Sequence, residues 1–328
     1  MLGMRGYTPK FIDDAKKAKF KGNYILQILI FIAVFLITNI VSSMIPVIIV
    51  IGAMIPKIME SVSSLDVNSP SYMQDTLELS QSLTNDIYSN SAFLLSTLFA
   101  TVITTVLVII YCRFIEKRSL GSMGFVKKKS VSDYLIGIVI GFAIYALALA
   151  INFFTGSVEY NGMVMTGGIG LILLFALGFF FQGMSEEVVL RGYFMSSLSI
   201  KSPVIVAVIT NSVVFGLLHA GNPGVTVFAL INIALFGVFM SVYMLKTGSI
   251  WGVCAIHSVW NFVQGNIFGG YVSGLNPNST VFSFTPVEGK ELWSGGSFGF
   301  EGGLAVTIVL AVAIAVTAAI KPRKLEEK

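Results

Sequence analysis

The sequence has little charge. Only 12% of its 328 residues are Asp, Glu, Lys or Arg, whereas soluble domains carry about 25%. Hydrophobic residues make up 55%, and the mean hydropathy is +0.84. This composition excludes an ordinary soluble domain and indicates an integral membrane protein. The formal net charge of +4 does not point to a nucleic-acid partner, because the cytoplasmic loops of membrane proteins collect Lys and Arg.

Cysteines and several familiar catalytic motifs are also scarce or missing. The two cysteines, Cys112 and Cys254, both fall in apolar stretches, so neither a disulfide framework nor a thiolate metal site is expected. The sequence contains no His-Glu-x-x-His of zinc metalloproteases, no Gly-x-Ser-Gly of rhomboid proteases and no paired-aspartate signature of presenilin-like proteases. It also lacks a nucleotide-binding P-loop.

Long apolar runs, in contrast, are abundant. A helix of about 20 apolar residues crosses a hydrocarbon core about 30 Å thick. The runs predict an all-α polytopic membrane protein with about eight transmembrane helices, in a single helical membrane domain over residues 1–328. The eight runs are Tyr24–Ile55, Ser91–Cys112, Tyr134–Phe154, Gly168–Phe194, Pro203–His219, Val225–Leu245, Ile250–Phe268 and Gly303–Ile320.

Charged residues between the runs predict the orientation. Residues 57–90 are polar and acidic, and we expect an external loop with room for a short amphipathic helix. Basic residues between positions 113 and 129 predict a cytoplasmic connection. With an even number of runs and basic ends, both termini are predicted to lie in the cytoplasm of a multi-pass cell-membrane protein. Pro46 and Pro56 are expected to kink or end the first helix.

One apolar run carries charge where a bilayer penalises it. Glu186, Glu187 and Arg191 fall inside it, although a charged side chain at the bilayer centre costs about 2.5–3.5 kcal/mol on insertion scales. Glu187 and Arg191 are four residues apart on one helical face, so we predict a structural ion pair. Glu186 points about 100° away and is available as a general base. A purely structural salt bridge among all three is the simpler alternative.

Both histidines of the chain also fall in apolar runs. His219 ends one run, with Phe215 one turn before it, and His257 precedes Asn261 by one turn, so each pair shares a helical face. A glutamate with a histidine can deprotonate water, and a second histidine with an amide can stabilise an oxyanion. Asn211 is a weaker neighbouring candidate.

Two other interpretations of these residues remain open. Glu186, His219 and His257 could together hold a catalytic zinc ion with an open position for water. The same polar cluster could also belong to a non-catalytic membrane protein, such as a binding or immunity protein or a small transporter. Whether Glu186 is needed for turnover separates the two catalytic interpretations, glutamate-activated water and zinc, from the non-catalytic one.

Three ordered motifs give a family resemblance. They are Glu186-Glu187-x-x-x-Arg191, Phe215-x-x-x-His219 and His257-x-x-x-Asn261. In this order on separate runs they resemble the motifs of the CPBP family, which includes type II CAAX prenyl endopeptidases and bacterial Abi proteins associated with bacteriocin processing or self-immunity. The resemblance covers about residues 133–268, which we take as the catalytic core, and it implies a fold of about eight membrane helices.

The resemblance implies an intramembrane endopeptidase that acts on a membrane-associated peptide or protein. In this activity Glu186 and His219 activate water, and His257 and Asn261 stabilise the oxyanion. Glu187, Arg191 and Phe215 would support them structurally. No cofactor is required by this scheme, with zinc as the alternative.

Counting residues along each helix places these motifs at different depths in the membrane. If the fifth helix begins at Pro203, His219 lies about 24 Å further along it, whereas Glu186 and His257 lie near the cytoplasmic ends of their helices. The motifs can meet if the fourth helix continues past Phe194, or if the fifth helix starts outside the hydrocarbon core and is tilted.

Overall fold

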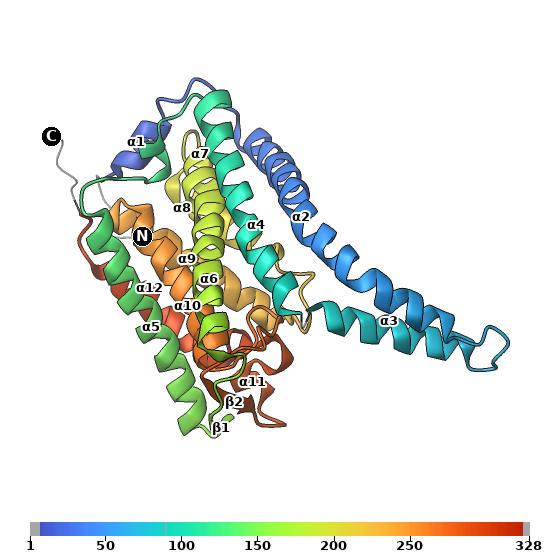
Figure 1. The fold of residues 1–328 in the computed structure, drawn as a ribbon. Helices are drawn as coiled ribbons and strands as arrows, with labels where there is room; N and C mark the ends of the chain where they lie inside the picture. The colour runs from blue at the N-terminus through green and yellow to red at the C-terminus, as the bar shows by residue number, and fades with distance from the viewer. Residues whose placement is uncertain (1–6, 89, 324–328) are drawn as a thin grey trace.

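The computed structural model describes residues 7–88 and 90–323, and most of them are helical (Figure 1). The α-helices are α1 (Lys10–Ala15), α2 (Tyr24–Ser63), α3 (Tyr72–Tyr88), α4 (Ser91–Ile110), α5 (Ser130–Phe154), α6 (Gly168–Glu187), α7 (Ser196–Leu198), α8 (Val204–Leu217), α9 (Val227–Thr247), α10 (Ile250–Phe262), α11 (Glu291–Ser294) and α12 (Leu304–Ala319). The π-helical segments are η1 (Tyr111–Ile115), η3 (Val188–Met195) and η4 (Val263–Ile267), and the 3-10 turns are η2 (Leu120–Met123), η5 (Gly296–Phe298) and η6 (Phe300–Gly302).

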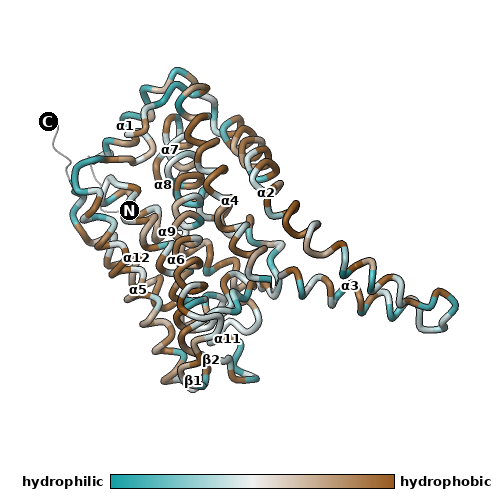
Figure 2. Tube along the Cα trace, viewed as in Figure 1, coloured by the Kyte–Doolittle hydropathy of each residue, from teal (hydrophilic) through white to brown (hydrophobic). Residues whose placement is uncertain are grey.

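Five helices of the described chain are long and apolar enough to cross a membrane. They are Tyr24–Ser63, Ser91–Ile115, Ser130–Phe154, Gly168–Leu198 and Val227–Thr247. The helices α8 and α12 are apolar but shorter. Figure 2 shows hydrophobic residues along these helices and hydrophilic residues mainly in the connections. The all-α polytopic membrane fold is therefore confirmed, while the number of eight spans stays a prediction.

Capping side chains explain where several of these helices begin. The Asn23 side chain accepts a hydrogen bond from the Leu26 amide at 2.9 Å, and Asn90 and Thr226 cap α4 and α9 in the same way. An oxygen-bearing side chain at this position satisfies backbone amides that have no partner within the helix. The polar residues at the edges of the apolar runs thus set the first turn of each helix.

The helix α10 lies between α5 and α6, and glycines allow the close approach. A Cβ atom on Gly137 of α5 would lie 2.4 Å from the Gly252 carbonyl oxygen, and one on Gly183 of α6 would lie 2.6 Å from the Ser258 amide nitrogen. Small residues at such contacts let membrane helices pack backbone to backbone. The position of α10 is therefore fixed by its two neighbours.

The helix α6 continues through η3 and α7 as one helix of 31 residues, Gly168–Leu198. This helix continues past Phe194. Such a continuation is one of the two conditions under which the motifs can meet. The fifth expected span is shorter than predicted, because α8 ends at Leu217 and His219 lies in the turn that follows. The backbone turns there, which carries His219 back toward the bundle.

The first helix is longer than predicted. Pro46 and Pro56 both lie inside α2 and do not end it, so the helix continues to Ser63. Residues 57–90, expected as an external loop, contain the last turns of α2 and all of α3. Figure 1 shows α2 leaving the bundle sideways and α3 returning beside it. The amphipathic helix expected in this segment is thus present, as a 17-residue helix.

A small antiparallel sheet, which the sequence analysis did not predict, closes one end of the bundle. Strand β1 (Val158–Met163) pairs with β2 (Phe282–Pro286), with Val158 opposite Pro286. The described ends of the chain meet elsewhere: the Tyr7 hydroxyl donates to the Arg323 carbonyl oxygen at 2.7 Å. The two termini proper, residues 1–6 and 324–328, for which we predict a cytoplasmic location, lie outside the described residues.

The connection after α4 is held by a buried arginine. The Arg118 guanidinium pairs with Glu116 at 2.9 Å and donates to the hydroxyl oxygens of Ser196 and Ser197 on α7. Arg118 and Glu116 have no exposed side-chain surface. Breaking such a pair leaves an uncompensated buried charge, so this cluster fixes the end of the long helix that begins with α6.

Candidate active site

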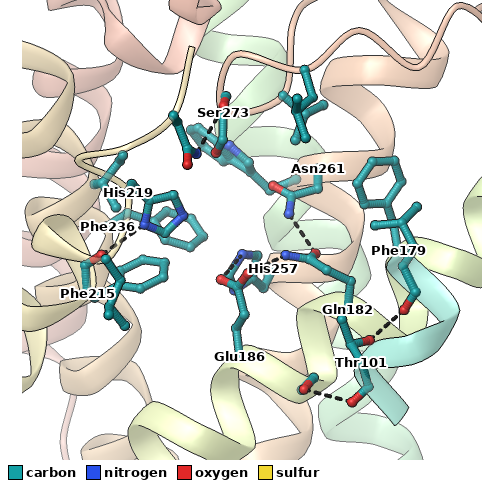
Figure 3. Close-up of a pocket in the computed structure, with 18 of the residues that line it drawn as sticks. Thr101, Phe179, Gln182, Glu186, Phe215, His219, Phe236, His257, Asn261 and Ser273 are labelled. Atoms are coloured by element: carbon teal, nitrogen blue, oxygen red, sulfur yellow. Dashed lines mark hydrogen bonds and ion pairs between the residues drawn. The ribbon is translucent and has the colours of Figure 1, made fainter. Parts of the chain in front are cut away.

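A cavity of about 360 Å³ lies among α2, α4, α6, α8, α9 and α10. The four residues predicted to be catalytic all line it: Glu186, His219, His257 and Asn261. They come from α6, the turn after α8, and α10. Figure 3 shows them around one space. The structure thus brings His219 together with the other three side chains, although depth counting had separated it from Glu186 and His257.

Glu187 organises the buried side of the site. Its Oε1 atom accepts hydrogen bonds from Arg191 Nη1 at 2.9 Å and from His257 Nδ1 at 2.7 Å. The predicted ion pair between Glu187 and Arg191 is therefore confirmed, and both side chains are fully buried. The guanidinium also lies 4.7 Å from the centre of the Phe215 ring. The contact between Glu187 and His257 was not predicted.

Glu186 faces the cavity with one oxygen held and the other unpaired. Gln182 Nε2 donates to Glu186 Oε1 at 2.5 Å. Glu186 Oε2 is buried without a hydrogen-bond partner and lies 3.6 Å from His257 Nε2. That separation is too short for a water molecule to lie between the two atoms. Oε2 accepts no hydrogen bond of its own, and a water molecule in the cavity reaches it once the Glu186 or His257 side chain shifts.

Gln182 links two of the predicted residues and was itself missed. Its Oε1 atom accepts from Asn261 Nδ2 at 2.9 Å, while its Nε2 donates to Glu186. The chain of hydrogen bonds from Asn261 through Gln182 to Glu186 fixes which way each amide points (Figure 3). A signal was present in the sequence, because Gln182 stands four residues before Glu186 and so shares its helical face.

His219 lies on the opposite wall, in the turn after α8. Its Nδ1 atom lies 2.9 Å from the Phe215 carbonyl oxygen, and its ring packs edge-on against the Phe215 ring with centres 4.9 Å apart. A carbonyl oxygen can only accept a hydrogen bond, so Nδ1 carries the proton. When the ring is neutral, its Nε2 atom can accept a hydrogen bond.

A second buried carboxylate, Glu301 in η6, also lines the cavity and was missed by the sequence analysis. Its Oε1 atom accepts from the amide of Ser273 at 2.6 Å and from its hydroxyl at 2.9 Å, and Trp260 Nε1 donates to Oε2 at 3.4 Å. The Ser273 carbonyl oxygen accepts from Asn222 Nδ2 at 3.0 Å. These contacts, which we name the Glu301 latch, tie the turn that bears His219 to the segment before α12.

Burial governs the charge of the latch. It raises the pKa of Glu301 above its ordinary value, while the Ser273 hydrogen bonds and the positive charge of His219, when that ring is protonated, act in the opposite direction. A carboxylate that loses hydration is disfavoured unless donors or positive charge compensate it. The two Ser273 donors therefore stabilise the charged form of Glu301 and, with it, the contacts of the latch.

The remaining sequence candidates lie outside the cavity wall. Asn211 is buried and donates from Nδ2 to the Ser241 hydroxyl at 3.1 Å, so it packs behind the site. Cys112 and Cys254 are buried free thiols, as expected. Tyr193 is a packing aromatic whose ring meets Tyr111 edge-on at 5.3 Å.

The zinc alternative requires three ligands to converge. Among residues 7–88 and 90–323, no group of three His, Cys, Asp or Glu side chains is arranged to hold a metal ion. Nδ1 of His257 is engaged by Glu187, and Nδ1 of His219 faces the Phe215 carbonyl oxygen, which leaves the two Nε2 atoms as the nitrogens that could bind a metal. The zinc alternative stays a prediction, and no catalytic step is routed through a metal.

Comparison with known protein families finds a match. Residues 167–263 match the family model described as Type II CAAX prenyl endopeptidase Rce1-like. This range contains all three motifs, from Glu186 to Asn261, and lies inside the predicted core 133–268. It confirms the resemblance to the CPBP family over this segment, and the family is one of CAAX protease-type intramembrane endopeptidases. No curated protein and no solved structure gave a significant match.

Proposed function

From this family match we propose that the protein is an intramembrane endopeptidase that hydrolyses a peptide bond of a membrane-associated peptide or protein by activating water with a glutamate. The observation that carries the proposal is the position of Glu186 Oε2. This carboxylate oxygen accepts no hydrogen bond, lies 3.6 Å from His257 Nε2 and belongs to a side chain that lines the cavity together with His219. A general base must be within hydrogen-bond reach of the proton that it removes.

In the first step, a water molecule beside Glu186 Oε2 gives its proton to the carboxylate while its oxygen attacks the carbonyl carbon of the peptide bond. The Nε2 atom of the neutral His219 ring accepts the second hydrogen of that water as a hydrogen bond and so orients it. The carbonyl oxygen becomes the negative oxyanion of a tetrahedral intermediate. A positioned base of this kind contributes about 10²–10⁴-fold to the rate.

In the second step the intermediate collapses. The carbon–nitrogen bond breaks, and the proton held on Glu186 passes to the leaving amine. Asn261 has a second amide hydrogen besides the one given to Gln182, and an imidazolium at His257 between two carboxylates offers Nε2–H; both can donate to the oxyanion. Removing one oxyanion donor costs about 2.7–4 kcal/mol of transition-state stabilisation.

The protein is a multi-pass membrane protein, and we propose that it lies in the cell membrane with both termini in the cytoplasm. The contact between Tyr7 and Arg323 supports this orientation, because it holds the two described ends at the same end of the bundle. The basic connection between α4 and α5 supports it further, since cytoplasmic loops are rich in Lys and Arg. The partner of the site is then a peptide or protein that reaches it from the membrane.

The deciding experiment is cleavage of a peptide library by purified protein, with and without a chelator. We compare wild type with Glu186→Gln, and use Glu159→Gln on the exposed part of β1 as the matched control. Glu186→Gln should lower the rate at least about 100-fold, while Glu159→Gln should leave it unchanged. Thermal unfolding of each variant shows whether any loss of rate comes from loss of fold.

Each outcome has a distinct meaning. Cleavage that needs Glu186 and survives chelation supports glutamate-activated water. Cleavage lost with chelator and restored by zinc assigns Glu186, His219 and His257 to a metal. A well-folded Glu186→Gln protein with full activity contradicts the proposal. If wild type binds peptides without cleaving any of them, the non-catalytic binding interpretation gains support.

A further inference from the structure

The helix α2 is too long for a single straight crossing. Its 40 residues extend about 60 Å, twice the roughly 30 Å thickness of a hydrocarbon core. Its first half packs beside α4, and Phe35 and Asn39 there line the cavity. The second half and α3 project sideways from the bundle (Figure 1). We name residues 51–87 the α2–α3 hairpin.

One edge of the hairpin is apolar and exposed. On α2 it carries Ile55, Met59 and Val62, which are spaced like one side of a helix and are 47%, 68% and 53% exposed. On α3 it carries Met73 and Leu77, which are 80% and 59% exposed. None of these side chains is covered by another part of the described chain. A soluble surface rarely leaves such a continuous apolar strip in water.

The other edge of the hairpin is charged and mainly acidic. Lys57 and Glu60 lie on it in α2, and Asp75, Glu78 and Asp86 lie on it in α3. Lys57 and Asp86 form an ion pair, so the polar edges of the two helices face the same way. The apolar edges therefore share the opposite face. Figure 2 shows both hydrophobic and hydrophilic residues along α3.

The structure also indicates what covers the apolar face. The membrane-crossing part of α2 also exposes large apolar side chains, such as Ile32 and Ile40, and the helix continues past the buried Pro46 and the exposed Pro56 into the hairpin. In a membrane, the exposed apolar side chains of the crossing part face lipid. An amphipathic helix with an apolar edge and a charged edge lies in the membrane interface, with its apolar face about 5–10 Å into the lipid.

We propose that the α2–α3 hairpin lies flat in the membrane interface, with Met59 and Met73 toward the acyl chains and Glu60 and Glu78 toward water. The hairpin is a lipid-binding surface outside the segment that matches the endopeptidase family. Through α2 it is joined to the cavity wall that Phe35 and Asn39 line. The proposal does not depend on catalysis, so it can fail or succeed independently of the proposed function.

The test uses spin labels on the full-length protein in phosphatidylcholine nanodiscs. Native Cys112 and Cys254 are buried, so a thiol-reactive label attaches at introduced cysteines. Met59→Cys and Met73→Cys report on the apolar edge, and Glu60→Cys and Glu78→Cys are the matched controls on the acidic edge. Accessibility of each label is measured to oxygen, which concentrates in lipid, and to a nickel chelate, which stays in water.

We expect oxygen to relax the labels at 59 and 73 more than nickel, and the reverse order at 60 and 78. If nickel dominates at all four positions, the hairpin projects into water and the proposal is wrong. If the labels at 59 and 73 are shielded from both reagents, and their spectra show spin–spin broadening that disappears on dilution with unlabelled protein, a second copy covers the face instead. That outcome also overturns the lipid assignment.

Discussion

The two walls of the cavity hold their histidines in different ways. His257 lies on α10, which α5 and α6 fix by backbone contact, and its Nδ1 is bound to the buried carboxylate of Glu187. His219 lies on a turn, and a main-chain carbonyl and the Glu301 latch hold it. Sites built on packed helices are positioned more rigidly than sites on loops. The helical wall is thus preorganised, while the turn wall depends on contacts distant in sequence.

The largest expected effect is on the helical wall. Glu187→Gln should lower the free energy of unfolding by about 3–5 kcal/mol, because the Arg191 charge stays buried without its partner. Thermal unfolding in nanodiscs measures this loss. Glu186→Gln is the control, because its side chain is 30% exposed and it should change stability little. A stable but inactive Glu187→Gln protein would show that the roles of the two glutamates are reversed.

A smaller effect tests the contact between α6 and α10. Gly183→Ala places a Cβ atom 2.6 Å from the Ser258 amide nitrogen, so α10 must move. We expect a loss of about 1–3 kcal/mol in unfolding free energy and a lower cleavage rate, since His257 moves with its helix. Gly170→Ala in the same helix is the matched control, because nothing lies within 4 Å of its added Cβ. Equal behaviour of the two variants would contradict the close packing.

The smallest effect concerns the turn wall. At neutral pH, Glu301→Gln should change the unfolding free energy by no more than about 1.5 kcal/mol, because the amide oxygen can still accept from Ser273. The pH dependence should change more clearly. The pKa of Glu301 is raised in the folded state, so the folded protein binds the extra proton and stability falls as pH rises from the ordinary value of 4.5 through the raised pKa.

Unfolding followed between pH 4.5 and 7 measures this slope. Glu301→Gln removes the titrating group, so its stability should fall less with pH than that of wild type over this window. Glu288→Gln, at an exposed position of the same connecting segment, should keep the wild-type slope. An unchanged slope in Glu301→Gln would show that the latch carboxylate does not titrate there.

The sequence was informative wherever chemistry repeats at helical spacing. The pair of Glu187 and Arg191, four residues apart, is present as predicted, and the four candidate catalytic residues line one cavity. The same spacing relates Gln182 to Glu186. Glutamine is uncharged, however, so its presence in an apolar run does not by itself indicate a functional site. Its role appears only when the amide of Asn261 is seen to reach it from another helix.

Other features could not be read from local patterns. Glu301 reaches the cavity because a connecting segment folds back over it, and no periodicity encodes that path. The strands β1 and β2 pair across more than a hundred residues. Pro46 and Pro56 suggested an end to α2, but a helix whose surface faces lipid can continue through proline when neighbouring groups or local adjustments satisfy the freed carbonyls.

In the π-helical segment η3, the number of residues matters as well as the chemistry of their side chains. A π-turn bonds residue i to i+5, so the segment Val188–Met195 accommodates more residues than an α-helical path of the same rise. Deleting one residue there would remove an extra residue and restore regular α-helix, so the residues after it would keep roughly their present orientation. Ser196 and Ser197 would then still face Arg118. The same deletion in the α-helical part of α6 would rotate everything after it by about 100° and should be far more damaging than the deletion in η3.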